Sequence, residues 1–296
     1  MRVGYPCVNR TVGCSAGRTF RLASYSHERM ERAVGENLSC LARILEYNLA
    51  EGLLFFRISS DTVPFASHPV CDFEWVDRFA GDFSALGSFI RSHGMRVSMH
   101  PDQFVLINSP DRDVVRRSIA ELDYHCRLLD AMGLGPDAKV QIHVGGLYRD
   151  RDTAMRRFVS EYRSLPGAVT GRMVIENDDR LFCLADCLDL HEKTGVPVLF
   201  DCFHHLCLNR GEPMDEAFDS AMKTWKRTDG PPMADYSEQE SGKRTGSHAG
   251  SMDETRFREF IGQCPEADFD LMLEIKDKEA SAIRALRILK ETGRII

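Results

Sequence analysis

Eight short apolar runs rich in β-branched residues recur along the chain, and longer stretches with helical periodicity separate them. This alternation is typical of repeated strand–helix units around a parallel sheet. In residues 30–50, for example, apolar side chains recur at spacings of three and four, as on the buried face of a helix. Residues 112–132, 181–194 and 280–292 read the same way. The predicted strands are residues 2–5, 53–58, 96–99, 139–144, 172–176, 198–201, 233–237 and 269–274.

Eight such units in 296 residues are close to the minimum for a closed barrel. We therefore predict the α/β class and a single (β/α)8 TIM-barrel domain over residues 1–296. Glycines follow several helical stretches, as expected where a helix stops before the next strand, at positions 52, 94, 133 and 195. Two segments interrupt the rhythm, a long loop at 61–73 after the second strand and a polar, Gly- and Pro-rich stretch at 228–251, but neither has the length or composition of a second domain.

The composition favours a cytoplasmic protein with no membrane contact. The chain has no run of about 20 apolar residues and no basic segment followed by an apolar one at its start. Its ten cysteines include no CxxC pair and no framework spacing, so reduced thiols are expected.

Imidazoles and carboxylates stand where the predicted strands end. The carboxyl ends of barrel strands share one face, where loops converge and active sites are built. A lone histidine or glutamate there is usually structural, but six strands in a row, the third to the eighth, each supply a ligand-type residue at or just past the end. Buried charges of one sign tolerate each other only around cations, so we predict a metal centre. The residues are His100, His143, Glu176, Asp201, His204, Asp235, His248 and Glu274.

Several longer motifs resemble the UV damage endonucleases. That family is related to the endonuclease IV-like barrels and, more distantly, to the xylose isomerase-like barrels, and the resemblance covers nearly the whole chain. The motifs are GYPC at 4–7 with Asn9, FASHP at 65–69, MHPDQF at 99–104, IEND at 175–178, DCFHH at 201–205 and LEIKDKE at 273–279.

The resemblance implies a metal-dependent endonuclease that acts on damaged double-stranded DNA. It would nick the duplex immediately 5′ to cyclobutane pyrimidine dimers, 6-4 photoproducts and other distorting lesions, leaving a 3′-hydroxyl and a 5′-phosphate. It also implies two or three divalent ions, of which manganese is expected and zinc or cobalt are alternatives, and no obligate protein partner.

Residue roles follow from the same resemblance. One ion would be held by His100, His143 and Glu176, and a second by Glu176, Asp201, Glu274 and the strand-seven residue. A third, less complete site would use His204 and His248. Glu176 and His68 would be the catalytic residues.

Strand seven departs from the relatives that the chain most resembles. They carry a lysine, which can be carboxylated, at the place of Met233, and a histidine ligand at the place of Asp235. An aspartate still binds a hard cation, so we expect Asp235 to be a ligand. Met233 cannot replace a carbamate, and we expect it to fill the core.

Lesion recognition would depend on probing weakened base stacking. By resemblance, the lesion-binding residues are Gln103 and Phe104 in the loop after strand three, with Tyr5 and Asn9 approaching from the other side. The net charge of −7 requires the phosphate contacts to come from local basic groups. The candidates are Arg10, Arg18, Arg21, Lys223, Lys226, Arg227, Lys243 and Arg244.

Two other hypotheses compete with the endonuclease. A xylose isomerase-like sugar isomerase or epimerase uses similar ligands but needs a tight polar pocket for a small polyol, whereas residues 100–110 read as a probing loop. The other hypothesis is a non-catalytic DNA or metal binder. It predicts that the Glu176→Ala change has no effect on activity, because the wild-type protein would have none.

Overall fold

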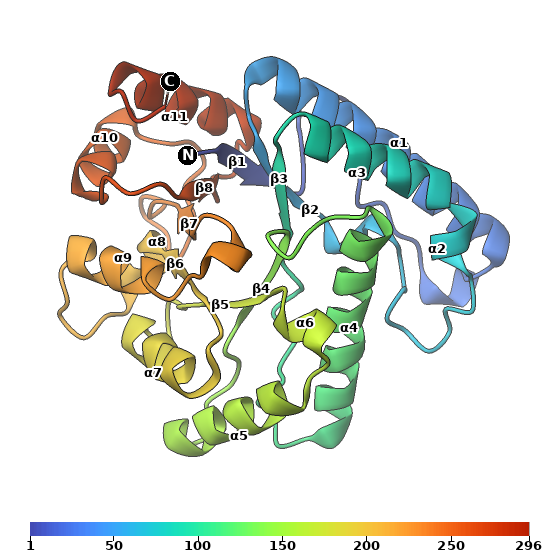
Figure 1. Cartoon of the computed structure of the whole chain (residues 1–296), viewed down its shortest axis with the longest axis horizontal. Coiled ribbons are helices and arrows are strands. Elements are labelled where there is room, and N and C mark those ends of the chain that lie inside the picture. Colours follow the sequence, from blue (N-terminus) through green and yellow to red (C-terminus); the bar gives the residue numbers. More distant parts are fainter. Residues whose placement is uncertain (296) are drawn as a thin grey trace.

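Eight parallel strands close into one barrel in chain order, with the helices outside them (Figure 1). The computed structural model describes residues 1–295, so position 296 of the predicted domain lies outside the described residues. Strand β1 pairs with both β2 and β8, which closes the ring and confirms the predicted TIM barrel. The strands are β1 Val3–Pro6, β2 Phe55–Ile58, β3 Arg96–Met99, β4 Lys139–His143, β5 Met173–Glu176, β6 Val198–Asp201, β7 Met233–Tyr236 and β8 Asp270–Leu273.

The predicted strands agree closely with these bounds. Strands β3 and β6 coincide with the predictions, and the other six differ by one or two residues at an end. The differences arise because the hydrogen-bonded ladder does not follow the limits of the apolar run.

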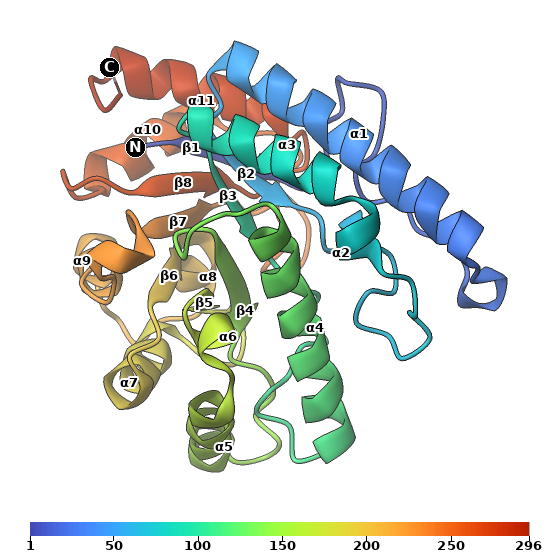
Figure 2. The ribbon, with the colours of Figure 1, turned by 45° about the vertical axis from the view of Figure 1, so that its right-hand side comes forward.

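The helices form the outer layer, and α1 and α3 lie side by side on it (Figure 2). The four predicted helices are confirmed as α1, α4, α7 and α11, with ends that differ by one to three residues where they differ. Helix α1 begins after Ser26, whose side chain accepts a hydrogen bond from the Arg29 amide, and it stops at Gly52, whose φ of 76° suits glycine. The helices are α1 His27–Glu51, α2 Trp75–Arg78, α3 Ala80–Ser92, α4 Arg112–Ala131, α5 Arg151–Ser164, α6 Gly167–Thr170, α7 Leu184–Thr194, α8 Cys202–Cys207, α9 Met214–Met222, α10 Glu254–Gln263 and α11 Glu279–Glu291, with short 3-10 turns η1 Leu22–Ser24, η2 Ser60–Thr62 and η3 Arg227–Asp229.

The side chains that fill the barrel form an apolar layer below a polar one. The apolar layer is a separate buried cluster of Phe55, Val174, Leu199, Met233 and Met272, so Met233 fills the core as predicted. Because side chains alternate along a strand, the residue two positions further on faces the same way. Those residues are all polar and lie toward the carboxyl ends of the strands: Arg57, Glu176, Asp201, Asp235 and Glu274.

The expectation that all cysteines are reduced is wrong for one pair. Cys14, in the loop after β1, forms a disulfide with Cys40 of α1, and the other eight cysteines are free. The two residues are 26 positions apart, and only the packing of the loop on the helix brings them together. The sequence carries no local pattern that announces this contact.

Reducing the disulfide is expected to lower the free energy of unfolding by about 3 kcal/mol, because the linkage restricts a loop of this length in the unfolded chain. Urea unfolding with and without dithiothreitol measures the change. A Cys14→Ser/Cys40→Ser variant is the control and should show the lower stability under both conditions. Equal stability of the oxidised and reduced wild-type protein would contradict the prediction.

The buried His125 is expected to make the folding stability of the protein sensitive to acid. Its side chain is fully buried in α4, where Nδ1 donates to the Glu121 carbonyl oxygen at 2.7 Å. Burial, partly offset by this hydrogen bond, lowers its pKa to about 4. The unfolded chain binds a proton at His125 below about pH 6.5, so the stability is present above that pH and is lost as pH falls toward 4. Over this pH range the free energy of unfolding falls by about 3 kcal/mol.

Urea unfolding at pH 7 and pH 4 measures this effect. A His125→Asn variant should lose less stability on acidification than the wild type, by about that amount. A change at the exposed His93 (His93→Asn) is the matched control and should leave the wild-type profile intact. If His125→Asn and the wild type lose the same stability, the explanation fails.

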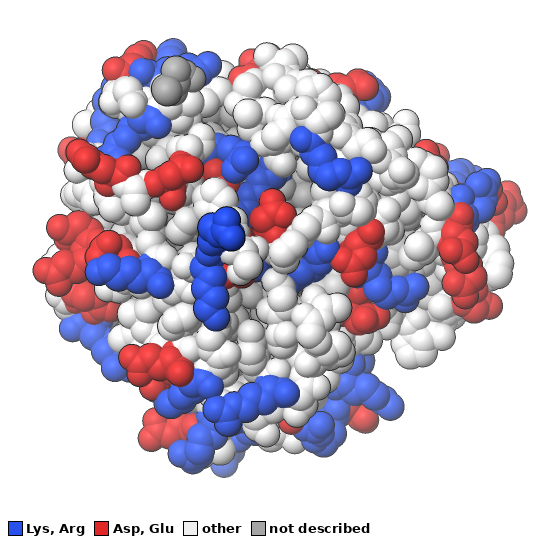
Figure 3. Space-filling model, in the orientation of Figure 1, with Lys and Arg blue, Asp and Glu red and all other residues white. Residues whose placement is uncertain are grey.

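Two surface features bear on the class of protein. Among residues 1–295, no helix has both the length and the apolar character that a membrane crossing requires. Basic and acidic side chains are interspersed over the face seen in Figure 3. That face therefore offers both signs of charge to a ligand.

Candidate metal centre

Three groups of ligand-type atoms meet at the carboxyl ends of the strands. In each group the atoms lie within 4.8 Å of one another, and neighbouring groups share a carboxylate. Glu176 belongs to the first and second groups and Asp201 to the second and third, so the groups form one continuous centre. The groups are His100, His143 and Glu176; Glu176, Asp201 and His204; and Asp201, Asp235 and Glu274.

Glu176 is the middle of this centre. It is the last residue of β5 and is fully buried. Its Oε2 lies 3.3 Å from Nε2 of His100, and its Oε1 lies 3.1 Å from Nδ1 of His204. The carboxylate therefore has one oxygen toward each of two neighbouring histidines, a position from which it can bridge two ions.

Backbone carbonyl oxygens orient three of the histidines, and one of them is His204, whose Nδ1 donates to the carbonyl oxygen of Asn177 at 3.0 Å. Nδ1 of His100 donates to the carbonyl oxygen of Pro101 at 2.8 Å, and Nδ1 of His248 donates to that of Glu274 at 2.9 Å. A proton on Nδ1 leaves the lone pair on Nε2, the tautomer that binds a metal. The strand ends thus supply both the ligands and the acceptors that orient them.

Asn177 ties the end of β5 to the end of β6. Its side chain accepts from the Asp201 amide at 3.0 Å and donates to the Asp201 carbonyl oxygen at 2.9 Å. Asp201 in turn caps α8 by accepting from the His204 amide at 2.7 Å. One strand end and one helix start therefore fix the relative positions of three of the ligand-type residues.

Burial and neighbouring charges move the pKa values of three ligand-type residues away from their usual ranges. Burial raises the pKa of Glu176, but His143, His100 and His204 together bring it well below its usual range. Burial raises the pKa of Asp201 well above its usual range, against the attraction of His204. The charged His204 counters its own burial, and its pKa rises to about 11 beside Asp201 and Glu176. Two adjacent carboxylates are thus driven toward opposite protonation states, which a cation between them would relieve.

Unpaired polar atoms in the centre fit divalent cations. Buried side-chain atoms without a hydrogen-bond partner cost free energy unless another ligand satisfies them. Four such atoms belong to this centre, and their mixed nitrogen and oxygen chemistry suits zinc, manganese or cobalt. They are Nδ1 of His143, Oε1 of Glu176, Oδ2 of Asp201 and Oδ1 of Asp235.

The centre opens into a cavity of about 640 Å³ at the barrel mouth. Lys276 and Lys278 line this cavity, and both follow β8 directly. Cys7 and Lys278, also in the lining, have positive φ values of 66° and 57°. Residues other than glycine rarely adopt a backbone with positive φ. Such backbone strain tends to cluster at functional sites.

The structure brings seven of the eight predicted metal ligands into the three groups and leaves His248 at the edge. Nδ1 of His248 lies 3.9 Å from Oε2 of Glu274, and its ring centre is 6.0 Å from that of His204. The predicted pairing of His204 with His248 is looser than the contacts of His204 with Glu176 and Asp201.

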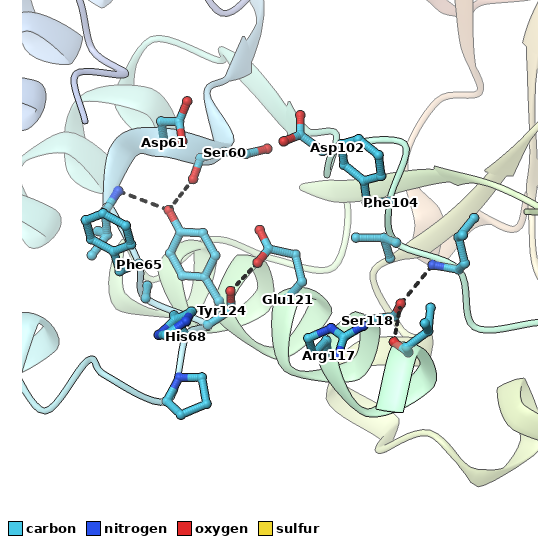
Figure 4. Close-up of a pocket in the computed structure, with 17 residues that line it drawn as sticks. Ser60, Asp61, Phe65, His68, Asp102, Phe104, Arg117, Ser118, Glu121 and Tyr124 are labelled. Atoms are coloured by element: carbon cyan, nitrogen blue, oxygen red, sulfur yellow. Dashed lines mark hydrogen bonds between the residues drawn. The ribbon is translucent and has the colours of Figure 1, made fainter. Parts of the chain in front are cut away.

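His68 lies outside the three groups. It is exposed and lines a neighbouring cavity of about 490 Å³. Phe65 and His68 lie on one side of this cavity and Phe104 on the other, with Glu121 and Tyr124 of α4 between them (Figure 4). The predicted catalytic role of His68 stays a prediction.

The loop after β3 separates the two cavities. Asp102 and Phe104 line both of them, and Gln103 lines the metal cavity. Phe104 is 73% exposed, although it is a large apolar side chain. The predicted wedge residues therefore stand at the mouth, beside the metal groups.

Tyr5 and Asn9 occupy a different position from the expected one. Both are buried, and the Tyr5 hydroxyl donates to Asn48 at 2.6 Å and accepts from Asn9 at 2.7 Å. Asn9 also accepts from the amides of Thr11 and Val12. In this conformation the pair supports the loop after β1, and its direct contact with a lesion stays a prediction.

Three of the predicted phosphate-binding residues lie at the end of the barrel opposite the metal groups. Lys223, Lys226 and Arg227 precede β7, near Asp229, which accepts from Lys139 at the first residue of β4. They therefore lie at the amino ends of the strands, whereas the metal groups lie at the carboxyl ends. The predicted bounds of strand seven, 233–237, already put these residues ahead of that strand, on the side of its amino end.

Arg57 and Gln141 belong to the centre, although the sequence patterns did not predict them. Nη2 of Arg57 donates to Asp235 at 2.7 Å and to Gln141 at 2.8 Å, and Nη1 pairs with Glu274. Gln141 donates to Glu176 at 2.7 Å and to Asp235 at 2.9 Å. A signal was present, since each is a polar residue at an inward position of an apolar strand.

Residues 1–295 match the family model described as UV-endonuclease UvdE. The UV DNA damage endonuclease of Clostridium perfringens is 36% identical over 298 residues, covering 100% of this chain and 72% of that protein. The crystal structure of SacUVDE superimposes with a TM-score of 0.95 at 46% identity, covering both chains completely.

More distant structures share the fold alone. Endonuclease IV from Thermus thermophilus has a TM-score of 0.61 at 16% identity, covering 98% of each chain. Solved sugar epimerases match at 11 to 17% identity. The family-level match extends along the whole described chain and includes all the groups of the centre. The chain belongs to the UV-endonuclease UvdE family.

Proposed function

We propose that this chain is a DNA repair endonuclease that nicks duplex DNA immediately 5′ to cyclobutane pyrimidine dimers and 6-4 photoproducts. The products would be a 3′-hydroxyl and a 5′-phosphate, and other distorting lesions would also be substrates. The observation that carries the proposal is the family match over residues 1–295 together with three adjoining ligand groups at the barrel mouth.

The proposed cofactors are divalent ions, manganese in the first place, with zinc or cobalt as alternatives. His100, His143, Glu176, Asp201, His204, Asp235, His248 and Glu274 would hold them. When bound, such ions supply Lewis acidity and lower the pKa of a coordinated water, which suits phosphodiester hydrolysis.

The residues of the chain would position the DNA and exclude water. Lys276 and Lys278 line the mouth and offer positive charge to a phosphate. Glu176 and Asp201 are fully buried below them, so their charges act where bulk water does not screen them. The carbonyl oxygens of Pro101 and Glu274 hold the imidazoles of His100 and His248 in one tautomer during the reaction.

Lesion recognition would come from Phe104 and Gln103. An exposed ring beside the centre can stack on bases, and an amide can form hydrogen bonds with base edges. We propose that these side chains enter weakened duplex steps, with Tyr5 and Asn9 supporting or contacting the opposite side and His68 acting in catalysis. The chain would act as one domain on damaged DNA in the cytoplasm, without an obligate protein partner.

A nicking assay on defined duplexes tests the proposal. One strand carries a 5′ label and a single cyclobutane dimer, and the protein is loaded with manganese, zinc or cobalt in turn. We expect one cut directly 5′ to the dimer, a product that polymerase extends from its 3′-hydroxyl, and no cut in the undamaged duplex. Metal-loaded protein that leaves the damaged duplex intact would refute the proposal, and turnover of a ketose would favour the epimerase hypothesis.

A further inference from the structure

The loop after β4 contains a strained turn on the same face of the barrel as the metal groups. The loop starts after His143, the last residue of β4, and ends at Asp150, which caps α5. The Asp150 amide donates to the Leu147 carbonyl oxygen at 3.1 Å, and the two residues between them have positive φ values, 50° at Tyr148 and 73° at Arg149. Turns with positive φ at both central residues favour asparagine and glycine, so a tyrosine followed by an arginine is strained there.

Contacts from two neighbouring segments hold this turn in place. The Asn108 side chain donates to the Gly146 carbonyl oxygen at 2.9 Å and accepts from the Gly146 amide at 3.2 Å. The Arg157 guanidinium lies 5.2 Å from the centre of the Tyr148 ring, and its Nε donates to the Asn108 carbonyl oxygen at 2.8 Å. A Cβ on Gly146 would lie 2.8 Å from the Tyr148 ring, so the ring packs closely over the glycine backbone. The surrounding contacts therefore maintain a conformation that the turn residues themselves do not favour.

The two side chains of the turn are available to a ligand. Tyr148 is 38% exposed, and Arg149 is exposed as well. Within residues 1–295, the Arg149 guanidinium has no ion pair, whereas Arg151 in the same segment pairs with Asp186. A free guanidinium beside a partly exposed aromatic ring suits a nucleic-acid backbone, because arginine pairs with phosphate and an aromatic ring packs on sugars and bases.

Asn108 connects this turn to the loop that we propose for lesion recognition. That loop follows β3, carries Gln103 and Phe104, and passes through Asn108 before α4 begins. Because Asn108 is fully buried and forms two hydrogen bonds with Gly146, the positions of the two loops depend on each other. A specific DNA interface buries about 1,000–2,500 Å² of protein surface, so it extends from the metal cavity onto the neighbouring loops.

We propose that the Tyr148–Arg149 turn is a further DNA-binding site, which holds the sugar–phosphate backbone beside the lesion. Arg149 pairs with a phosphate, and the Tyr148 ring packs on the adjoining deoxyribose. Backbone contacts of this kind fix the position of the duplex and do not distinguish damaged from undamaged DNA. Asn108 and Arg157 are positioning residues that act through the turn. The inference rests on the proposed function, because it takes duplex DNA as the ligand.

The salt dependence of DNA binding tests the role of Arg149. Fluorescence anisotropy gives the dissociation constants of damaged and undamaged duplexes of one sequence over a range of salt concentrations, in EDTA so that neither duplex is cut. For Arg149→Gly we expect the slope of log affinity against log salt concentration to become shallower by about 0.9, the contribution of one phosphate contact. At about 0.1 M salt the affinity for both duplexes should fall by roughly fivefold to tenfold.

Arg149→Gly also separates a binding role from a structural one. Glycine adopts a positive φ without strain, so the variant should unfold at a urea concentration no lower than that of the wild type while it binds DNA more weakly. A residue that served only the fold would instead lose stability when replaced. Arg149→Lys keeps the charge and should keep the wild-type slope. Arg163→Gln is the matched control, because it removes an exposed arginine at the other end of α5, away from the mouth, and it should also keep the slope.

Two changes at Tyr148 test the second contact. Tyr148→Phe keeps the ring and should bind both duplexes as the wild type does, because the proposed contact is made by the ring. Tyr148→Ala should weaken binding to both duplexes by a similar factor. Wild-type affinity in Tyr148→Ala would overturn the contact with the deoxyribose.

An unchanged slope in a folded Arg149→Gly protein would overturn the proposal, as would a loss of affinity confined to the damaged duplex. If Arg149→Gly does not fold, Arg149→Gln replaces it, with the same expected slope. A protein that shows the expected change of slope but does not nick damaged DNA would refute the proposed function and leave this inference standing. A protein that nicks damaged DNA but keeps the wild-type slope in Arg149→Gly would refute this inference alone.

Discussion

Replacing Glu176 with glutamine is expected to reduce nicking of dimer-containing DNA by at least about a thousandfold. Glu176 is the carboxylate common to two ligand groups, with one oxygen toward His100 and the other toward His204. Glutamine has nearly the same shape but cannot carry the negative charge that a bridge between two cations requires. Loss of about 4 kcal/mol of transition-state stabilisation corresponds to that factor.

Single-turnover nicking rates at saturating manganese measure this effect, and the metal content of the variant should fall by at least one ion per chain. Asp270→Asn is the control, since Asp270 is also buried but begins β8 at the far end of the barrel, where it pairs with Arg96. It should keep its metal content and a nicking rate close to that of the wild type. Wild-type nicking rates in the Glu176→Gln protein would show that Glu176 is not part of the catalytic centre.

Replacing Phe104 with alanine is expected to weaken binding to dimer-containing duplex by about tenfold to a hundredfold, with unchanged metal content. The ring is 73% exposed at the mouth, so little folding energy depends on it. Stacking of one base on an aromatic side chain contributes about 1–3 kcal/mol, which gives that range. Gln103→Ala should act in the same direction and mainly reduce discrimination between damaged and undamaged DNA.

Fluorescence anisotropy with damaged and undamaged duplexes of one sequence provides the measurement. Phe104→Tyr keeps the ring and should bind as the wild type does. Leu206→Ala removes another exposed apolar side chain, 66% exposed on α8, and serves as the matched surface control. Equal binding by Phe104→Ala and Leu206→Ala would show that Phe104 is not a wedge.

Most of the barrel follows from local patterns in the sequence. The eight apolar runs predict all eight strands to within two residues at each end, because each run is long enough to be buried and is separated by an amphipathic helix. The same patterns predict which strands end in ligand-type residues. Seven of these residues meet in the three groups, since parallel strands in a barrel present their carboxyl ends to one opening.

Residues that act through contacts with distant strands were harder to predict. Arg57 is one polar position in an apolar run, and its importance appears only when β2 faces β7 and β8 across the barrel. His68 belongs to a recognisable motif, yet its loop places it in a neighbouring cavity. Tyr5 and Asn9 are in the expected loop, but their side chains pair with Asn48 of α1 and with each other.

The ligand-type residues at the strand ends were thus determined by the sequence alone, because strand periodicity and barrel closure leave only one place for them. The tertiary structure decided how their charges are balanced. It placed Arg57 between Asp235 and Glu274 and gave Glu176 two histidine neighbours. The disulfide between Cys14 and Cys40 was also a tertiary result. The physical reason is that short-range periodicity specifies which side of a strand or helix faces the core, whereas ion pairs and disulfides depend on distances between segments far apart in the chain.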